Sequence, residues 1–273
     1  MCLFVTTAHV MEPPFPGVAG HYVNLGVCYD RQALAPLRED LIQVTRDYKS
    51  CYDRAYQRFR AAVELQRSGE WLLQPHADQE KLKKRVQGIV ARECKNRKTG
   101  RGNPIYRFLG GLSCQGRVTL WDTVFLQCKK VYELRDGRSG LANQMLSQLA
   151  EGALQGGYHP VICLSPEDPS RVDHLLLPEL SLGFITGGNY GPAQRPYRRI
   201  HLESLIEKEA WKVHRNELRF AWRIADELIE DGLRELRRAK ERHDQLEELY
   251  HPHVDFAKME RMADQLAEEI LAM

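Results

Sequence analysis

The sequence repeats itself at an offset of 177 residues. Residues 75–82 match residues 252–259, and both stretches read Pro-His-x-Asp-x-x-Lys followed by an apolar residue. A period of this length indicates duplicated domains rather than a solenoid, whose repeats are far shorter. Near the N-terminus the register slips by three, because Phe4-Val5-Thr6 matches Phe184-Ile185-Thr186. We therefore expect an incomplete first unit that begins just before one of its late strands.

The second unit contains a segment typical of an α/β fold. A short apolar run at 131–134 is followed by a glycine-containing loop at 136–140 and a helical stretch at 141–154. Gly156 and Gly157 end this helix. Further buried strands are expected in the segments that follow, at 161–164, 175–177 and 182–185. Strands that alternate with helices predict a parallel sheet with both faces covered.

The first strand-to-helix loop of such a sheet is the usual phosphate site, because backbone N–H groups and a helix N-terminus point at the anion. A P-loop of the form G-x-x-x-x-G-K-[ST] also needs a lysine for the phosphates and a hydroxyl for Mg²⁺. Here Leu141-Ala142-Asn143 follows Gly140, and no lysine occurs between Lys130 and Lys208. Arg138 offers a positive charge, but not at the position of the P-loop lysine.

The residues around and after this loop form a wider pattern. Its parts are the loop with its flanks at 134–146, the motif Asp168-Pro169-Ser170-Arg171-Val172-Asp173, the segment 175–180, and a charged helical segment at 239–270 that contains an Asp255-Phe256 turn. Together they resemble a family of poorly characterised bacterial tandem-domain P-loop ATPases. The resemblance spans nearly the whole chain, and residues 13–91 look like the second half of the family's first domain.

The resemblance implies a P-loop NTPase-like parallel sheet flanked by helices, with ATP and Mg²⁺ as candidate ligands. The degenerate nucleotide-binding loop would then consist of Gly137, Arg138, Ser139, Gly140, Ala142 and Asn143. Ala142 and Asn143 stand where the family has its lysine and serine. The strand that would deliver an acid toward Mg²⁺ ends instead in Thr186-Gly187-Gly188. Both departures argue against ATP hydrolysis.

Four regions follow from the repeat and the resemblance. Residues 1–91 are interpreted as the incomplete first unit, mainly a helical hairpin, and 92–107 as a basic linker. Residues 108–202 form the degenerate P-loop-like core, and 203–273 the helical hairpin of the second unit. Each hairpin is expected to consist of a long charged helix, a break, and a returning helix.

Two local sequence signals predict these hairpins. Long charged stretches at 33–71 and 204–250 carry apolar residues at helical spacing. Pro75 and Pro252 break these helices, and Asp78 and Asp255 are placed to cap the helices that return. His76 and His253 recur in the same turns, where a structural role is favoured over a metal pair.

Other charged residues offer weaker candidate sites. Asp168, Asp173 and His174 follow a strand's carboxyl end, where open α/β sheets bind ligands, although Asp168-Pro169 is also a common turn. A basic run extends from Arg92 to Arg107 and reads as a solvated linker or as a salt-sensitive contact to nucleic acid. A second basic cluster, Arg195, Arg198 and Arg199, lies near the expected loop and offers contacts to an anion.

The composition fits a cytoplasmic globular protein. The chain has 273 residues, of which 43% are hydrophobic, and a formal net charge of +2, so nothing global demands a polyanion. No apolar run is long enough for a membrane span, so no membrane partner is expected. Seven cysteines without a C-x-x-C pair favour reduced thiols over zinc or disulfides, and no metal ligands are assigned.

The sequence thus favours a P-loop NTPase-fold protein that has lost ATP hydrolysis and serves as a non-catalytic structural or regulatory partner. Its partner would be another protein, or a second copy, bound through the helical arms. The alternative is an ATP-binding protein or ATPase with an unconventional phosphate loop that uses Arg138, Asp168 and Asp173. A third hypothesis, nucleic-acid binding through the basic linker, is the least favoured.

Overall fold

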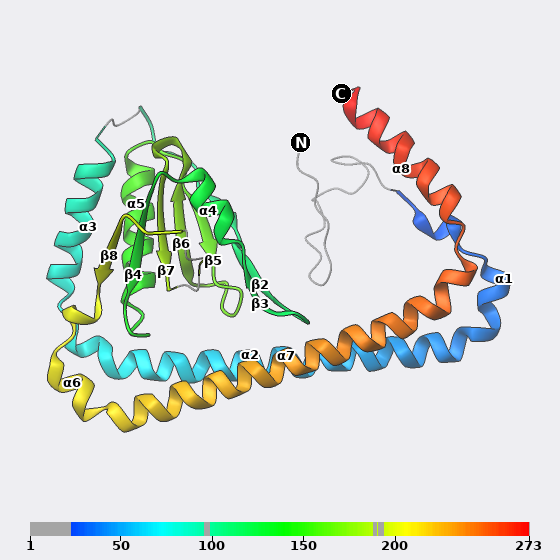
Figure 1. The fold of residues 1–273 in the computed structure, drawn as a ribbon, viewed down its shortest axis with the longest axis horizontal. Helices are drawn as coiled ribbons and strands as arrows, with labels where there is room; N and C mark the ends of the chain where they lie inside the picture. Colours follow the sequence, from blue (N-terminus) through cyan, green and yellow to red (C-terminus); the bar gives the residue numbers. More distant parts are fainter. Residues whose placement is uncertain (1–22, 96–98, 188–189, 191–193, 273) are drawn as a thin grey trace. The chain divides into compact units, whose positions relative to one another are not determined.

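The computed structural model describes residues 23–95, 99–187, 190 and 194–272. The expectations about residues 4–6, Arg97, Lys98 and Gly188 lie outside these residues. The chain divides into two compact units, one formed by residues 47–241 and the other by the chain before and after them. The larger unit holds the expected α/β core (Figure 1).

A six-stranded sheet forms the centre of the larger unit, with the strand order β1-β5-β6-β7-β4-β8. Its strands are β1 (Ile105–Arg107), β4 (Lys130–Arg135), β5 (Val161–Leu164), β6 (Val172–Leu177), β7 (Leu182–Thr186) and β8 (Arg198–His201). A separate antiparallel hairpin consists of β2 (Gly110–Ser113) and β3 (Gly116–Thr119). The sequence had predicted β4 to β7 but neither β1 nor β8.

The sheet is mostly parallel, and the predicted parallel sheet is interrupted at one strand. β1 runs parallel to β5, and β4 runs parallel to both β7 and β8. β6 is antiparallel to both of its neighbours. The connections on either side of β6, residues 165–171 and 178–181, are too short for a parallel crossover, which needs a dozen or more residues. The second of them contains the short 3-10 helix η4 (Pro178–Leu180).

Helices cover both faces of the sheet. α5 (Leu141–Gln155) packs on one face, where it meets alternate strand residues such as Tyr132, Leu134 and Leu175. α4 (Trp121–Gln127) covers the opposite face, where Val124 meets Val131. The alternation along β4 places its apolar side chains on both faces, as a doubly covered strand requires. α3 (Gln79–Glu93) lies against the outside of α5 (Figure 1).

The two long helices, α2 (Arg38–Leu73) and α7 (Arg215–Tyr250), pair with each other within the larger unit. Contacts join Gly69 to Trp222 and Phe59 to Gly232, so the helices run antiparallel. Arg54 forms an ion pair with Glu235 at 2.8 Å on the same seam. The sequence predicted a hairpin of each long helix with a returning helix, and it left open that the two long arms pair with each other. Apolar spacing identifies the buried face of a helix but not the element that covers it.

The predicted breaks and caps are confirmed. Pro75 and Pro252 lie in the 3-10 turns η3 (Gln74–His76) and η6 (His251–His253). The carboxylate of Asp78 accepts a hydrogen bond from the N–H of Lys81 at 2.9 Å and caps α3. Asp255 accepts from the N–H of Lys258 at the same distance and caps α8 (Phe256–Leu271).

The elements recur at the offset seen in the sequence. α2 and α7 each contain 36 residues, and they begin 177 residues apart. The shorter helices α3 and α8 also begin 177 residues apart. Each unit has a β-bridge beside the turn, Ala77 with Ile206 in one and Tyr29 with Val254 in the other. The remaining elements are η1 (Leu25–Cys28), α1 (Arg31–Leu34), η2 (Ala35–Leu37), η5 (Glu203–Leu205) and α6 (Lys208–Val213).

The segment interpreted as a basic linker is partly built into the core. α3 ends at Glu93, and the last three residues of the segment form the edge strand β1. Arg101 pairs with Glu151 of α5 at 2.7 Å. No helix in the described part of the chain combines the length and apolar character needed to cross a membrane.

Candidate functional site

The loop between β4 and α5 has the strand–loop–helix geometry that the sequence predicted. β4 ends at Arg135 and α5 begins at Leu141. Gly137, Arg138 and Gly140 have φ angles of 59°, 63° and 79°. Glycine adopts this left-handed region readily, whereas a non-glycine residue such as Arg138 rarely does. The loop therefore turns sharply enough to bring its backbone N–H groups close together.

A side chain of the loop itself uses these N–H groups. The Asp136 carboxylate accepts hydrogen bonds from the N–H of Arg138 and from the N–H of Ala142, both at 3.1 Å. The backbone oxygen of Asp136 accepts from the N–H of Ser139, also at 3.1 Å. Helix N-termini and turns of this kind attract anions. Here the anion in that position is the protein's own carboxylate.

A second carboxylate approaches the loop from α2. A Cβ atom placed on Gly140 would lie 2.7 Å from Oε2 of Glu70. The other oxygen of Glu70 pairs with Arg171 at 2.5 Å. Burial raises the pKa of Glu70 and outweighs the opposing effect of Arg171, and the nearby Asp136 raises the pKa further. The Glu70 carboxyl group thus lies against Gly140 and brings a second acidic side chain to the loop.

The loop borders a cleft of about 200 Å³ at the edge of the sheet. Asp136 follows β4, Thr186 ends β7, and Val172 begins the antiparallel β6, so all three meet at this edge. The cleft is lined by five carboxylic acids and three arginines, which are Glu70, Asp136, Glu167, Asp173 and Asp226 with Arg117, Arg138 and Arg171. Such a lining is mixed in charge and leans acidic, unlike a phosphate pocket.

The site residues expected from the sequence are only partly brought together. Arg138, Ala142, Asn143 and Asp173 line the cleft. Ser139 is almost fully buried, and its hydroxyl has no hydrogen-bond partner among the described residues. Gly137 and Gly140 shape the loop without lining the cleft.

Three of these side chains have structural partners. Asn143 accepts a hydrogen bond from the N–H of Val172 at 2.8 Å and so joins α5 to β6. Arg138 pairs with Asp226 of α7 at 3.1 Å. Asp168 lies outside the cleft lining and pairs with Arg67 of α2 at 2.6 Å. Burial favours a higher pKa for Asp168, but hydrogen bonds from Ser170 and Arg67 outweigh it and lower the pKa.

Two more carboxyl groups in the cleft are strongly desolvated. Burial raises the pKa of Asp173, although a hydrogen bond from Ser165 and the charge of Arg171 oppose it. Burial also raises the pKa of Glu167, which forms an ion pair with Arg117. Raised pKa values in a cleft often mark functional groups, and they also occur in structural ion-pair networks. Here each carboxyl has an arginine beside it, which favours the network.

Sequence reasoning missed several charged members of this lining. Glu70 and Asp226 come from the long helices, and Arg117 comes from the small hairpin. Nothing in their local sequence distinguishes them from other charged residues on these elements. Arg171 stood inside a recognised motif, but its partner Glu70 is about 100 residues away, so the ion pair had no local signal.

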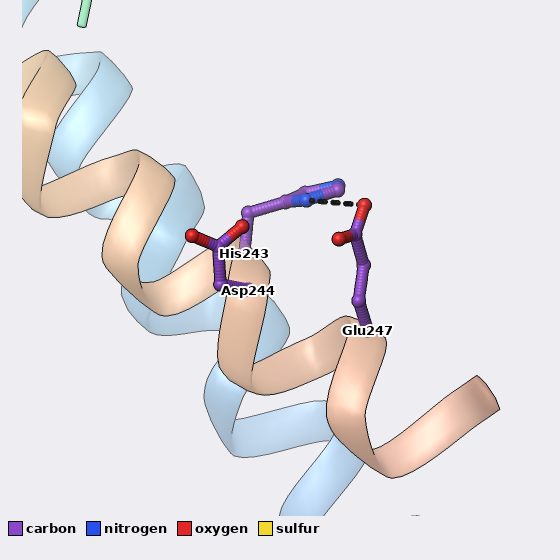
Figure 2. Close-up of side chains that lie close together, drawn as sticks. All are labelled: His243, Asp244 and Glu247. Carbon is purple, nitrogen blue, oxygen red and sulfur yellow. Dashed lines mark ion pairs between the residues drawn. The ribbon is translucent and has the colours of Figure 1, made fainter. Parts of the chain in front are cut away.

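Figure 2 shows a separate group of side chains on α7. His243, Asp244 and Glu247 offer ligand atoms that all lie within 4.8 Å of one another, the one such group found among the described residues. His243 Nδ1 lies 3.3 Å from Glu247 Oε1, an i,i+4 pair on a surface helix. This pairing accounts for the geometry without a bound cation.

Comparison of the chain with protein-family models, with curated proteins and with solved structures found no match.

Proposed function

We propose that this chain is an α/β protein of P-loop NTPase ancestry that has lost ATP hydrolysis and serves as a non-catalytic structural or regulatory partner. The observation that carries the proposal is the position of the Asp136 carboxylate. It takes the hydrogen bonds of the Arg138 and Ala142 N–H groups, which a nucleotide phosphate would otherwise accept.

Electrostatics support the same conclusion. A triphosphate in the loop would approach both Asp136 and Glu70, and like charges at short range in a partly buried site repel strongly. The residues that would offset this repulsion are engaged elsewhere. Arg138 pairs with Asp226, and the Asn143 side chain, at the position of the Mg²⁺ ligand, accepts from Val172. These contacts support a loop that no longer offers a phosphate its positive partners.

The alternative is an ATP-binding protein with an unconventional phosphate loop. Arg117, Arg138 and Arg171 line the cleft and are the residues that favour it. Binding would require each guanidinium to exchange its carboxylate partner for a phosphate. A variant that removes the charge of one of these carboxylates therefore distinguishes the two functions experimentally.

Titration of the full chain with a Mg²⁺-bound non-hydrolysable ATP analogue, followed calorimetrically, tests this proposal. The wild-type chain should give no binding heat at micromolar nucleotide, and phosphate release from ATP should equal the buffer blank. Glu70→Gln keeps the shape of the side chain and removes its charge, so any residual affinity should rise about tenfold, the equivalent of roughly 1.4 kcal/mol. Glu64→Gln, on an exposed part of the same helix, is the matched control. Turnover in the wild type that disappears in Arg138→Ala would overturn the proposal.

The partner role rests on α8. Its apolar residues Met259, Met262, Leu266 and Ile270 recur at helical spacing, yet no residue of α8 is buried among those described. Its counterpart α3, 177 residues earlier, buries Leu82, Val86 and Ile89 on the α5 side of the core. We infer that α8 packs against the α5-like helix of a second α/β domain, as α3 packs against α5. The four apolar side chains are half-buried, and Met262 accepts a hydrogen bond from the thiol of the buried Cys28, so the inference rests on a face that the chain covers only in part.

Hydrogen exchange on the isolated chain measures whether the α8 face is covered. Backbone amides of α8 should exchange much faster than those of α3, because α3 is held by its buried contacts. Protection of α8 equal to that of α3 would mean that its face is already covered within the chain. The docking surface would then have to be abandoned.

A further inference from the structure

A groove of about 480 Å³ lies between α3 and the edge strand β8. Arg85 and Arg92 of α3 line it on one side, and Arg198, Arg199 and His201 of β8 line it on the other. None of the described lining residues is an aspartate or a glutamate. Arg85, Arg92 and Arg198 therefore bring positive charge to one groove in a chain whose formal net charge is only +2, whereas the Arg199 guanidinium turns to Glu133 on the other face of the sheet.

Among the described residues, two of the four lining arginines have carboxylate partners and two do not. Arg92 pairs with Glu93 at 3.0 Å, and Arg199 pairs with the buried Glu133 at 2.7 Å. The Arg85 guanidinium donates to the backbone oxygen of His201 at 3.0 Å, and no ion pair with a carboxylate among the described residues compensates its charge. No carboxylate lies within ion-pair distance of Arg198 among the residues described. Arg85 and Arg198 thus give the groove an excess of positive charge.

The carboxylates near the groove are already shared between several cations. Glu93 also pairs with Lys130 at 3.0 Å, and Glu133 also pairs with Arg135 at 3.0 Å. His201 lies 3.4 Å from Glu203. These acids hold the arginines and Lys130 in place, and they do not cancel the positive charge of the groove.

An exposed aromatic ring stands beside the arginines. Tyr197 directly precedes β8, and 60% of its surface is accessible. Its ring packs edge-on against Tyr132, which lines the groove, with ring centres 5.4 Å apart. Lys130 Nζ lies 4.9 Å from the ring centre. These contacts fix the orientation of the ring and leave much of it open to solvent.

We propose that this groove binds single-stranded nucleic acid. Guanidinium groups match phosphate oxygens in bidentate geometry, and an exposed ring beside them offers a stacking surface for an unpaired base. An acidic peptide would use the arginines but would leave the ring without a role. Arg85 and Arg198 contact the backbone phosphates, and Tyr197 stacks on a base. Arg92 and Arg198, both singled out in the sequence, line this one groove.

Fluorescence anisotropy with the full chain and a labelled oligothymidylate of about 20 nucleotides tests the proposal. Affinity should fall by ten-fold or more between about 50 and about 200 mM NaCl. Arg85→Ala and Arg198→Ala should each weaken binding about five-fold and reduce the salt slope by about one. Tyr197→Ala should weaken binding to a similar degree without changing the salt slope.

Arg223→Ala is the matched control, because Arg223 lies exposed on α7 and pairs with Glu227 at 3.1 Å. It should bind the oligonucleotide like the wild type. An equal loss in Arg223→Ala would mean that the chain attracts polyanions without a defined groove, which overturns the proposal. Equal competition by free thymidine monophosphate, at the same phosphate concentration, would assign the groove to a small phosphate ligand and would also overturn it.

Discussion

Gly232→Leu should lower the free energy of unfolding by roughly 3 kcal/mol, the upper end of the range for overpacking a core. A Cβ atom at Gly232 would lie 2.4 Å from Cε1 and 2.8 Å from Cζ of Phe59. Phe59 is 5% exposed and belongs to the cluster that joins α2 to α7. Neither the ring nor the α7 backbone can retreat without opening the seam between the two helices. Urea unfolding followed by circular dichroism measures the loss.

Two further variants test whether the loss comes from the contact between Gly232 and Phe59. A Cβ atom at Gly88, in α3, would meet no atom within 4 Å. Gly88→Ala should therefore stabilise the chain by about 0.5–1 kcal/mol through helix propensity alone. Phe59→Leu combined with Gly232→Ala should recover part of the stability that Gly232→Ala loses. Equal unfolding midpoints for Gly232→Leu and the wild type would show that the helices do not pack through this contact.

The parts of the fold that depend on local signals were predictable. Asp78 and Asp255 cap the returning helices as their sequence position indicates, and Pro75 and Pro252 end the long ones. The strand, loop and helix from 130 to 155 also follow from local apolar patterning and glycine. Each of these features depends on residues that are close together in the chain.

Pairing between distant segments was not predictable in the same way. The apolar residues of α2 fit a partner on either α3 or α7, and the choice is made by close contacts such as Phe59 against Gly232. β6 carries the same leucine-rich pattern as a parallel strand, and its direction follows from the short connections around it. Counting those connecting residues would have revealed the antiparallel strand.

For the candidate site, the sequence predicted the position of the loop but not the carboxyl groups that contact it. Arg138, Asn143 and Asp173 line the cleft, whereas Asp168 pairs with Arg67 outside it. Glu70 approaches Gly140 from α2, and no local pattern connects these residues. Asp136 belongs to the predicted loop. Its capping role depends on the left-handed turn, which brings the Ala142 N–H within hydrogen-bond distance of the Asp136 carboxylate.

His174 should make the chain sensitive to mild acid. Burial in β6 lowers the pKa of His174 from 6.5 to about 4. Its Nδ1 accepts a hydrogen bond from the N–H of Thr186 at 3.2 Å, so the folded chain needs the neutral ring. The unfolded chain binds a proton near pH 6.5 and the folded chain only near pH 4, so the free energy of unfolding falls as the pH drops through this window. The full difference is about 3 kcal/mol.

His174→Gln removes the titrating ring and keeps a side chain able to accept a hydrogen bond. The variant should be less stable than the wild type near pH 7, and it should lose about 3 kcal/mol less stability on acidification to pH about 4. His251→Gln, in the exposed turn η6, is the control for removing a histidine. Urea unfolding at both pH values measures the difference. Equal losses in His174→Gln and the wild type would contradict a neutral, buried His174. Nitrogen chemical shifts give an independent check, because the ring of His174 should remain neutral near pH 5, where a solvated histidine is largely protonated.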